Sequence, residues 1–226
     1  MTTVADTHDV RDPGLPARLL AGERDALVPL LRGRAEEDFG AATCCPGWSV
    51  RDVLAHSAAA LSRVVEGRFE KGAFSPESND RDIAERGEWP VARIIDELER
   101  GMTEAGPVIA DAGGSLDGVA LGEWVHAGDV REAWDLPGAY GGPQLGLAVE
   151  LLTHLTRVRG TRPLHADLDD TDTPLLLGAP SGDAPPARYI GDAPTLVRLY
   201  SGRRPPAGTS YELAGATEAE LNLYTA

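Results

Sequence analysis

Apolar residues recur at helical spacing through the first part of the chain. Leucines three, four and seven positions apart form the apolar stripe of an amphipathic helix over roughly residues 14–38. Further helical stretches follow, and their short connections are typical of neighbouring antiparallel helices. The pattern therefore predicts a helical bundle without internal repeats. The leucines of the first stripe are Leu19, Leu20, Leu27, Leu30 and Leu31.

A second helix is expected to begin at Ser49. Ser49 suits the N-cap position, and Asp52, three residues later, completes a capping box. The helix is expected to end near Gly67 or Gly72, because glycine readily adopts the left-handed conformation of a C-cap. It would carry His56 two turns inside its start.

Three more helices are expected before residue 160. One starts with Pro90 in its first turn and carries a regular apolar stripe, with Pro107 as a kink or an early stop. The next is capped by Ser115 or Asp117, and the last spans residues 145–158. Residues 75–88 are rich in charge, serine and asparagine and are expected to form a loop.

The composition changes after Gly160, where aspartates, prolines and short apolar runs replace the helical stripes. We therefore predict two domains: a helical bundle over residues 1–160 and a small α+β unit over residues 161–226. Within the second domain, strands are expected at 175–177, 188–190 and 210–213, and short helices at 194–200 and 217–224.

The net charge of the chain excludes some classes of binding partner. The net charge is −15, from 36 acidic against 21 basic residues. Nucleic acids and anionic membranes are recognised by concentrated basic surfaces, so neither is an expected partner. The chain has no apolar run of membrane-spanning length, and residues 1–16 lack the apolar core of a signal peptide. We expect a cytoplasmic protein, monomeric or homodimeric, that binds small molecules.

The only two cysteines, Cys44 and Cys45, are adjacent. A disulfide between neighbouring residues is strained, and no CxxC spacing exists. A thiolate zinc site or a redox motif is therefore not expected.

The candidate chemistry lies on the second and fourth predicted helices. On a helical wheel, His56 falls beside the apolar stripe, so from that helix alone a surface or flank histidine is the simplest interpretation. On the fourth helix, Glu123 and His126 share the face that carries the apolar residues. A buried carboxylate needs a cation, an imidazolium or a metal, and Asp129 is close enough in sequence to orient the His126 ring.

Two interpretations of this spacing remain open. Two histidines and a carboxylate on two helices are the ligand set of a catalytic metal site with open positions. The alternative is a plain hydrogen bond from His126 to Glu123 or Asp129, because Glu-x-x-His also occurs by chance.

Three segments together resemble a known family. They are Cys45-Pro46-Gly47-Trp48-Ser49-Val50-Arg51-Asp52-Val53-Leu54-Ala55-His56, Trp124-Val125-His126-Ala127-Gly128-Asp129-Val130-Arg131, and Gly191-Asp192-Ala193 followed by Gly202-Arg203. They resemble the mycothiol-dependent maleylpyruvate isomerase-like proteins of the DinB-like metal-binding superfamily. The resemblance implies an α+β fold, with an N-terminal DinB-like four-helix-type bundle and a small C-terminal domain similar to sterol carriers.

The resemblance also implies site residues and cofactors. His56, Glu123 and His126 would bind a divalent metal, usually zinc, and the cosubstrate would be the low-molecular-weight thiol mycothiol. The family's usual glutamate stands four residues before the second histidine, where this chain has Gly122, so Glu123 would substitute with altered geometry.

Further roles are expected for residues near these motifs. His126, Asp129 and Arg203 are the expected catalytic residues, and Arg203 has the fork geometry for binding a carboxylate. Arg63 and Trp124 are the expected cofactor-binding residues.

Three functions are compatible with these features. The first is a metal- and mycothiol-dependent transferase or isomerase acting on a small electrophile. The second is a metal-free enzyme in which His126, Asp129 and Glu123 perform acid–base chemistry, such as a cyclisation or an elimination in a biosynthetic pathway. The third is a non-catalytic ligand-binding module of the same fold.

Overall fold

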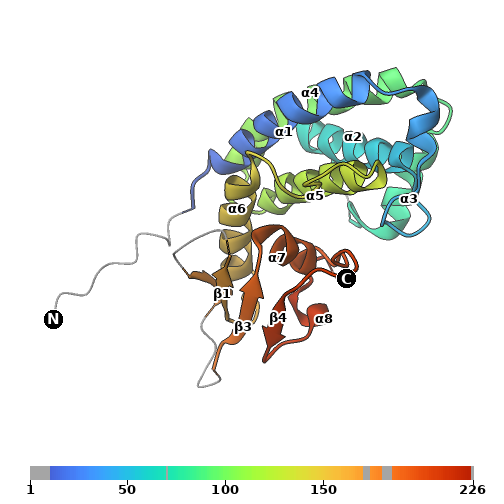
Figure 1. The fold of residues 1–226 in the computed structure, drawn as a ribbon. Helices are drawn as coiled ribbons and strands as arrows, with labels where there is room; N and C mark the ends of the chain where they lie inside the picture. The colour runs from blue at the N-terminus through green and yellow to red at the C-terminus, as the bar shows by residue number, and fades with distance from the viewer. Residues whose placement is uncertain (1–10, 70, 170–173, 180–184, 225–226) are drawn as a thin grey trace.

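A computed structural model shows a helical bundle joined to a small mixed sheet, which confirms the predicted α+β fold class (Figure 1). The structure describes residues 11–69, 71–169, 174–179 and 185–224, so residues 1–10, part of the segment expected to lack a signal peptide, lie outside the described residues. The helices of the bundle are α1 (Leu15–Arg32), α2 (Val50–Glu66), α3 (Pro76–Arg86), α4 (Val91–Asp111), α5 (Asp117–Ala133) and α6 (Leu145–Val158).

The bundle has two layers, with α1 and α4 lying over α2 and α5 (Figure 1). Helix α2 is largely enclosed, because α3, α4 and α5 all pack against it. Most of its side chains are buried, including His56, which is only 9% exposed. The interpretation of His56 as a surface or flank residue is therefore wrong: neighbouring helices cover the side of α2 beside its apolar stripe.

The start of α2 is built as predicted. Ser49 is the N-cap, its backbone N–H donates to Asp52 Oδ2 (2.9 Å), and the Asp52 backbone N–H donates to Ser49 Oγ (3.3 Å). Gly67 ends the helix in the left-handed conformation, at φ 67°. The capping box therefore fixes the rotation of α2 and with it the direction of His56.

Helix boundaries differ from the prediction at three places. Helix α1 ends at Arg32, and a short 3-10 helix, η2 (Glu36–Gly40), replaces its expected last turn. Helix α4 continues through Pro107 to Asp111, so this proline does not stop it. At the start of α5, neither Ser115 nor Asp117 caps the helix, because the N-cap position is Leu116 and no side chain bonds there.

The expected loop over residues 75–88 is wrong, since it contains α3. Ser75 caps this helix by accepting from the Ser78 backbone N–H (3.3 Å), and Pro76 occupies its first position. Ion pairs attach it to the bundle: Arg63 on α2 binds Asp82 (2.8 Å), and Arg86 binds Glu97 on α4 (2.7 Å). Charged rather than apolar side chains hold α3, which is why hydrophobic periodicity did not predict it.

The C-terminal unit is a four-stranded sheet with two helices, α7 (Ala193–Tyr200) and α8 (Glu218–Leu221). Its strand order is β2-β1-β3-β4, and β1 pairs with β3 in parallel and with β2 antiparallel. Three of these strands were expected, but β1 was not. Their bounds are β1 (Leu164–Leu168), β2 (Leu175–Leu177), β3 (Ala187–Gly191) and β4 (Glu212–Ala214).

Helix α6 connects the two parts of the chain. It packs against α1 and α5 of the bundle and against β2 and α7 of the C-terminal unit. The division into domains near residue 160 therefore stays a prediction. None of the described helices is long and apolar enough to cross a membrane.

Candidate functional site

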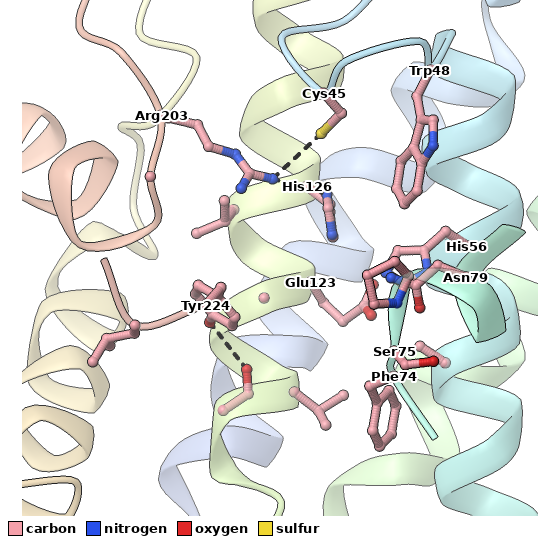
Figure 2. A pocket seen from close by; sticks show the side chains of 18 of the residues that line it. Cys45, Trp48, His56, Phe74, Ser75, Asn79, Glu123, His126, Arg203 and Tyr224 are labelled. Atoms are coloured by element: carbon pink, nitrogen blue, oxygen red, sulfur yellow. Dashed lines mark hydrogen bonds between the residues drawn. The ribbon is translucent and has the colours of Figure 1, made fainter. Parts of the chain in front are cut away.

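A pocket of about 800 Å³ lies between the bundle and the C-terminal unit. Helices α2 and α5 form its walls, the turn before α2 and the start of α3 border it, and the C-terminal segment closes one side (Figure 2). The residues discussed below that line it are Cys44, Cys45, Trp48, His56, Phe74, Ser75, Asn79, Gly122, Glu123, His126, Arg203 and Tyr224.

The turn before α2 delivers two cysteines and a tryptophan to this pocket. The Trp48 backbone N–H donates to the Cys45 carbonyl (3.0 Å), with Pro46 and Gly47 between them and Gly47 at φ 80°. Proline followed by a left-handed glycine is the sequence of a type II turn. Thr43 fastens the base of the turn, because its hydroxyl donates to the Trp48 carbonyl (2.9 Å).

His56 lies on α2 with its ring facing the pocket (Figure 2). The ring is 5.1 Å from the Trp48 ring and 5.1 Å from that of His126, between centroids. Burial, together with the charges of His126, Arg63 and Arg203, lowers the pKa of His56 to about 3. Its imidazole is therefore neutral near pH 7, and its Nδ1 atom has no hydrogen-bond partner.

Glu123 projects from α5 toward the same part of the pocket (Figure 2). The residue is 3% exposed, and burial raises the pKa of its carboxyl to about 8, despite a hydrogen bond from Ser57 that lowers it. Its Oε2 atom is buried without a partner. An unpaired buried oxygen is costly, so this carboxyl is suited to receive a cation or a donor from a ligand.

His126 is oriented by Asp129, one helical turn later on α5. Its Nδ1–H donates to Asp129 Oδ2 (3.0 Å), which leaves Nε2 as the nitrogen with a free lone pair. This is the hydrogen bond that the sequence left open as one of two interpretations. It does not decide between them, because a metal-ligating histidine makes the same bond with its other nitrogen.

Asp129 is the centre of a hydrogen-bond network that joins both parts of the chain. Arg203 donates to both of its oxygens (3.1 and 2.7 Å), and the Tyr140 hydroxyl donates to Oδ1. Burial alone would raise the pKa of Asp129, but the hydrogen bonds from His126 and Arg203 outweigh it and hold that pKa far below its usual range. Arg203 thus binds a carboxylate with its fork, and that carboxylate belongs to the protein.

The two cysteines complete the network. Cys44 Sγ lies 3.0 Å from Asp129 Oδ1 and Cys45 Sγ lies 3.3 Å from Oδ2, while Arg203 Nη2 donates to Cys45 Sγ (3.4 Å). A hydrogen bond from Cys45 lowers the pKa of the Cys44 thiol. A thiol site was not expected from the spacing of the cysteines along the chain, because folding brings the Asp129 carboxylate to this turn from a distant part of the sequence.

Arg63 and Trp124, the expected cofactor-binding residues, lie away from the pocket lining. The Arg63 guanidinium is buried against Asp82, to which it donates twice (2.9 and 2.8 Å). Trp124 is 1% exposed and packs edge-to-face on Tyr140, with ring centroids 6.3 Å apart. Trp48 is the tryptophan that lines the pocket.

The metal that the resemblance implies fits the types of ligand present. His56, Glu123 and His126 supply two imidazoles and a carboxylate, and two of these groups have buried atoms without partners. Among the described residues, however, the only three candidate ligands whose donor atoms all lie within 4.8 Å of one another are Cys44, Cys45 and Asp129. The side chains of His56, Glu123 and His126 would therefore have to move closer together to bind one ion.

The fold and the pocket define a helical-bundle protein with an appended α+β unit. Its sequence matches the family model described as mycothiol maleylpyruvate isomerase N-terminal domain over residues 20–145, more than half of the chain. The chain therefore belongs to this family, which confirms the resemblance found in its motifs. No curated protein matches the chain.

Two solved structures share the fold. The crystal structure of the mycothiol-dependent maleylpyruvate isomerase matches with a TM-score of 0.53 and 17% sequence identity, over 95% of this chain and 98% of that chain. A histidine-to-alanine mutant of that isomerase matches with the same TM-score and coverage and 18% identity. At this level of identity, the likeness supports the fold across both parts of the chain.

Proposed function

We propose that this protein is a metal- and mycothiol-dependent transferase or isomerase that acts on a small electrophilic substrate. The single observation that carries the proposal is the meeting of His56, Glu123 and His126 in one pocket of about 800 Å³. That volume is within the range of small-molecule sites. Family membership supports the choice of thiol, since the related isomerase is named as mycothiol-dependent.

In this proposal His56, Glu123 and His126 would hold a divalent cation, with zinc as the first choice. The cation would supply the positive charge that favours thiolate over thiol near neutral pH. Asp129 would keep the Nε2 atom of His126 directed into the pocket.

Trp48 and Phe74 would cover the reacting groups with apolar surface. The mycothiol thiolate would add to an electrophilic carbon: a conjugated double bond, an epoxide or a carbon with a leaving group. Departure of the thiol from the addition product would then give an isomer, and retention of the thiol would give a thiol adduct.

The cytoplasmic location and the monomeric or homodimeric state stay predictions.

Metal analysis combined with a thiol-dependent assay tests this function. Untagged protein purified without chelator should contain stoichiometric zinc or a similar cation. It should consume maleylpyruvate or a chromogenic aryl halide only when mycothiol is present. His56→Ala should lose both properties. His154→Ala is the matched control, because His154 lies on α6 near Asp117 and does not line the pocket.

Absence of metal from the purified protein would contradict the proposal, as would unchanged thiol-dependent turnover in His56→Ala.

A second candidate is the metal-free acid–base enzyme. It is favoured by the donor atoms of the three predicted ligands, which do not all lie within 4.8 Å of one another. Turnover that survives chelation and is lost in His126→Ala would select this second function.

A further inference from the structure

We propose that Cys44, Cys45 and Asp129 form a second cation site, for a thiophilic divalent ion such as Zn²⁺ or Cd²⁺, at the edge of the pocket. The two sulfur atoms and a carboxylate oxygen all lie within 4.8 Å of one another. Zinc binds thiolates at about 2.3 Å and carboxylates at about 2.0–2.2 Å, so ligands of one ion lie within about 4.6 Å of each other. Small side-chain rotations bring these three atoms to that separation.

The thiol protons mark where the ion would lie. Both cysteine sulfurs already face Asp129, at 3.0 and 3.3 Å. A cation would take the place of these protons: each S–H bond is replaced by a sulfur–cation bond, both protons leave to solvent, and no electron changes hands. The carboxylate then binds the ion instead of accepting from the thiols.

The surrounding charges balance such a site. Two thiolates and one carboxylate carry three negative charges, and a divalent ion with the Arg203 guanidinium carries three positive charges. Arg203 is already in place, with donors to both Asp129 oxygens and to Cys45 Sγ. Tyr140 supports the same carboxylate through its hydroxyl. The outer partners that orient metal ligands are thus present around Asp129 and Cys45.

An ion can also reach this site. Cys44 is exposed, Cys45 is partly exposed, and both line the pocket. The turn that carries them is fixed by backbone hydrogen bonds on both sides, Thr43 N–H to the Trp48 carbonyl (3.0 Å) and Trp48 N–H to the Cys45 carbonyl (3.0 Å). The backbone of the turn is therefore fixed, while the cysteine side chains can rotate and are reached by solvent from the pocket.

The site differs from the histidine and glutamate set in its ligands and in its preference. Thiolates select soft or borderline ions such as Cd²⁺ and Zn²⁺, whereas carboxylate and imidazole alone select them less strongly. Asp129 links the two sets, since it also accepts from His126. The inference does not depend on the proposed function, because it rests on residues outside the His56, Glu123 and His126 set.

Cadmium titration of the full-length, reduced and chelator-treated protein tests the site. Ultraviolet absorption from cadmium–thiolate charge transfer should rise and saturate, with release of about two protons per ion at this site. Cys44→Ser and Cys45→Ser should each weaken this binding by more than the roughly 10–100-fold that is lost when a residue hydrogen-bonded to a metal ligand is removed. Tyr140→Phe should weaken it by about tenfold.

His56→Ala is the matched control, and it should leave the thiolate absorption and its midpoint unchanged. Circular dichroism confirms that each variant is folded before titration. The proposal is overturned if cadmium produces no thiolate absorption in the wild-type protein, or if a single cysteine variant retains wild-type affinity. Loss of the thiolate signal in His56→Ala would also overturn it, because one shared site would then explain both sets. Failure of thiol-dependent turnover alone would count only against the proposed function.

Discussion

The Glu123 carboxyl illustrates how a single buried group links pocket chemistry to stability. Its pKa is raised from 4.5 to about 8 in the folded protein, so the unfolded chain ionises at lower pH than the folded one. Stability should therefore fall as the pH rises from about 4.5 to about 8, at about 1.4 kcal/mol for each unit of pKa difference. Below that window the contribution of Glu123 is constant.

Glu123→Gln should remove this loss, because glutamine does not titrate. In urea unfolding with chelator present, the wild type should lose on the order of a few kcal/mol more than the variant between pH 5 and pH 9. Parallel pH dependence in the two proteins would show that Glu123 is not desolvated. The comparison of slopes excludes the constant effect of replacing a carboxyl by an amide.

Alanine substitutions at two glycines of α5 are expected to change the stability of the protein in opposite directions. A Cβ at Gly122 would meet no atom closer than the Tyr224 hydroxyl at 3.7 Å, whereas a Cβ at Gly128 would lie 2.8 Å from the Tyr140 ring. Gly122→Ala should therefore stabilise the protein by roughly 0.5–1 kcal/mol through helix propensity. Gly128→Ala should destabilise it by about 1–3 kcal/mol through overpacking.

Urea unfolding of both variants checks this pair, and each serves as the other's control because the substitution and the helix are the same. A destabilised Gly122→Ala protein would mean that the space beside α5 is not open. The open space also bears on the glutamate position that the resemblance implies: Gly122 has room for a side chain, so crowding does not exclude a larger residue there.

At the scale of elements, α3 is held by buried charge, and this makes its stability sensitive to single substitutions. Asp82→Ala should cost about 3–5 kcal/mol, because it removes a buried carboxylate that accepts two hydrogen bonds from the buried Arg63 guanidinium. Asp96→Ala is the matched control, since it breaks an exposed pair with Arg32 and should cost less than about 1 kcal/mol.

Hydrogen exchange provides the element-level measurement for this prediction. In Asp82→Ala, the amides of α3 should lose protection before those of α4, because α3 contributes few apolar side chains to the core. Equal costs for the two aspartate variants would contradict a structural role for the buried pair.

Sequence patterns predicted elements where one local rule was sufficient. The capping box at Ser49 and the glycine at 67 fix α2, and the leucine pattern fixes α6 at its observed bounds. Strand β1 was missed because its partner β3 lies about 20 residues further along the chain, so its stability comes from pairing and not from its own pattern. Helix α3 was missed because ion pairs with α2 and α4 replace an apolar stripe.

At the scale of the whole molecule, some features of the site follow from local sequence and others only from contacts between distant segments. The spacing along one helix placed Glu123, His126 and Asp129 close together, whereas the wheel of α2 alone put His56 at the surface or flank. Cys44 and Cys45 lie against Asp129 because the turn before α2 contacts α5, more than 80 residues later in the sequence. A contact between such distant segments cannot be predicted from spacing along the chain. Arg203 was expected at the site, but its engagement with Asp129 required the packing of the two parts of the chain.

That packing makes Arg203 a structural link as well as a site residue. It joins the segment after α7 to the centre of α5 through Asp129, and Arg198 on α7 makes a second link to Glu132 (2.7 Å). Arg203→Met should leave the buried Asp129 carboxylate without its main cation, at a cost of about 3–5 kcal/mol. Arg188→Met is the control, because Arg188 pairs with Asp167 at the surface and should contribute less than about 1 kcal/mol.

Hydrogen exchange in both α5 and α7 tests whether Arg203 joins the two parts of the chain or only contacts the pocket. In Arg203→Met, protection should fall together in α5 around Asp129 and in α7, while the amides of β1 and β3 keep their protection. The reason is that the sheet pairs through its own backbone, whereas α5 is joined to α7 and to the segment after it by the ion pairs of Arg203 with Asp129 and of Arg198 with Glu132. If protection falls in α5 alone, Arg203 serves the pocket without holding the two parts together, and the pocket would then be bordered by a unit that α6 alone positions.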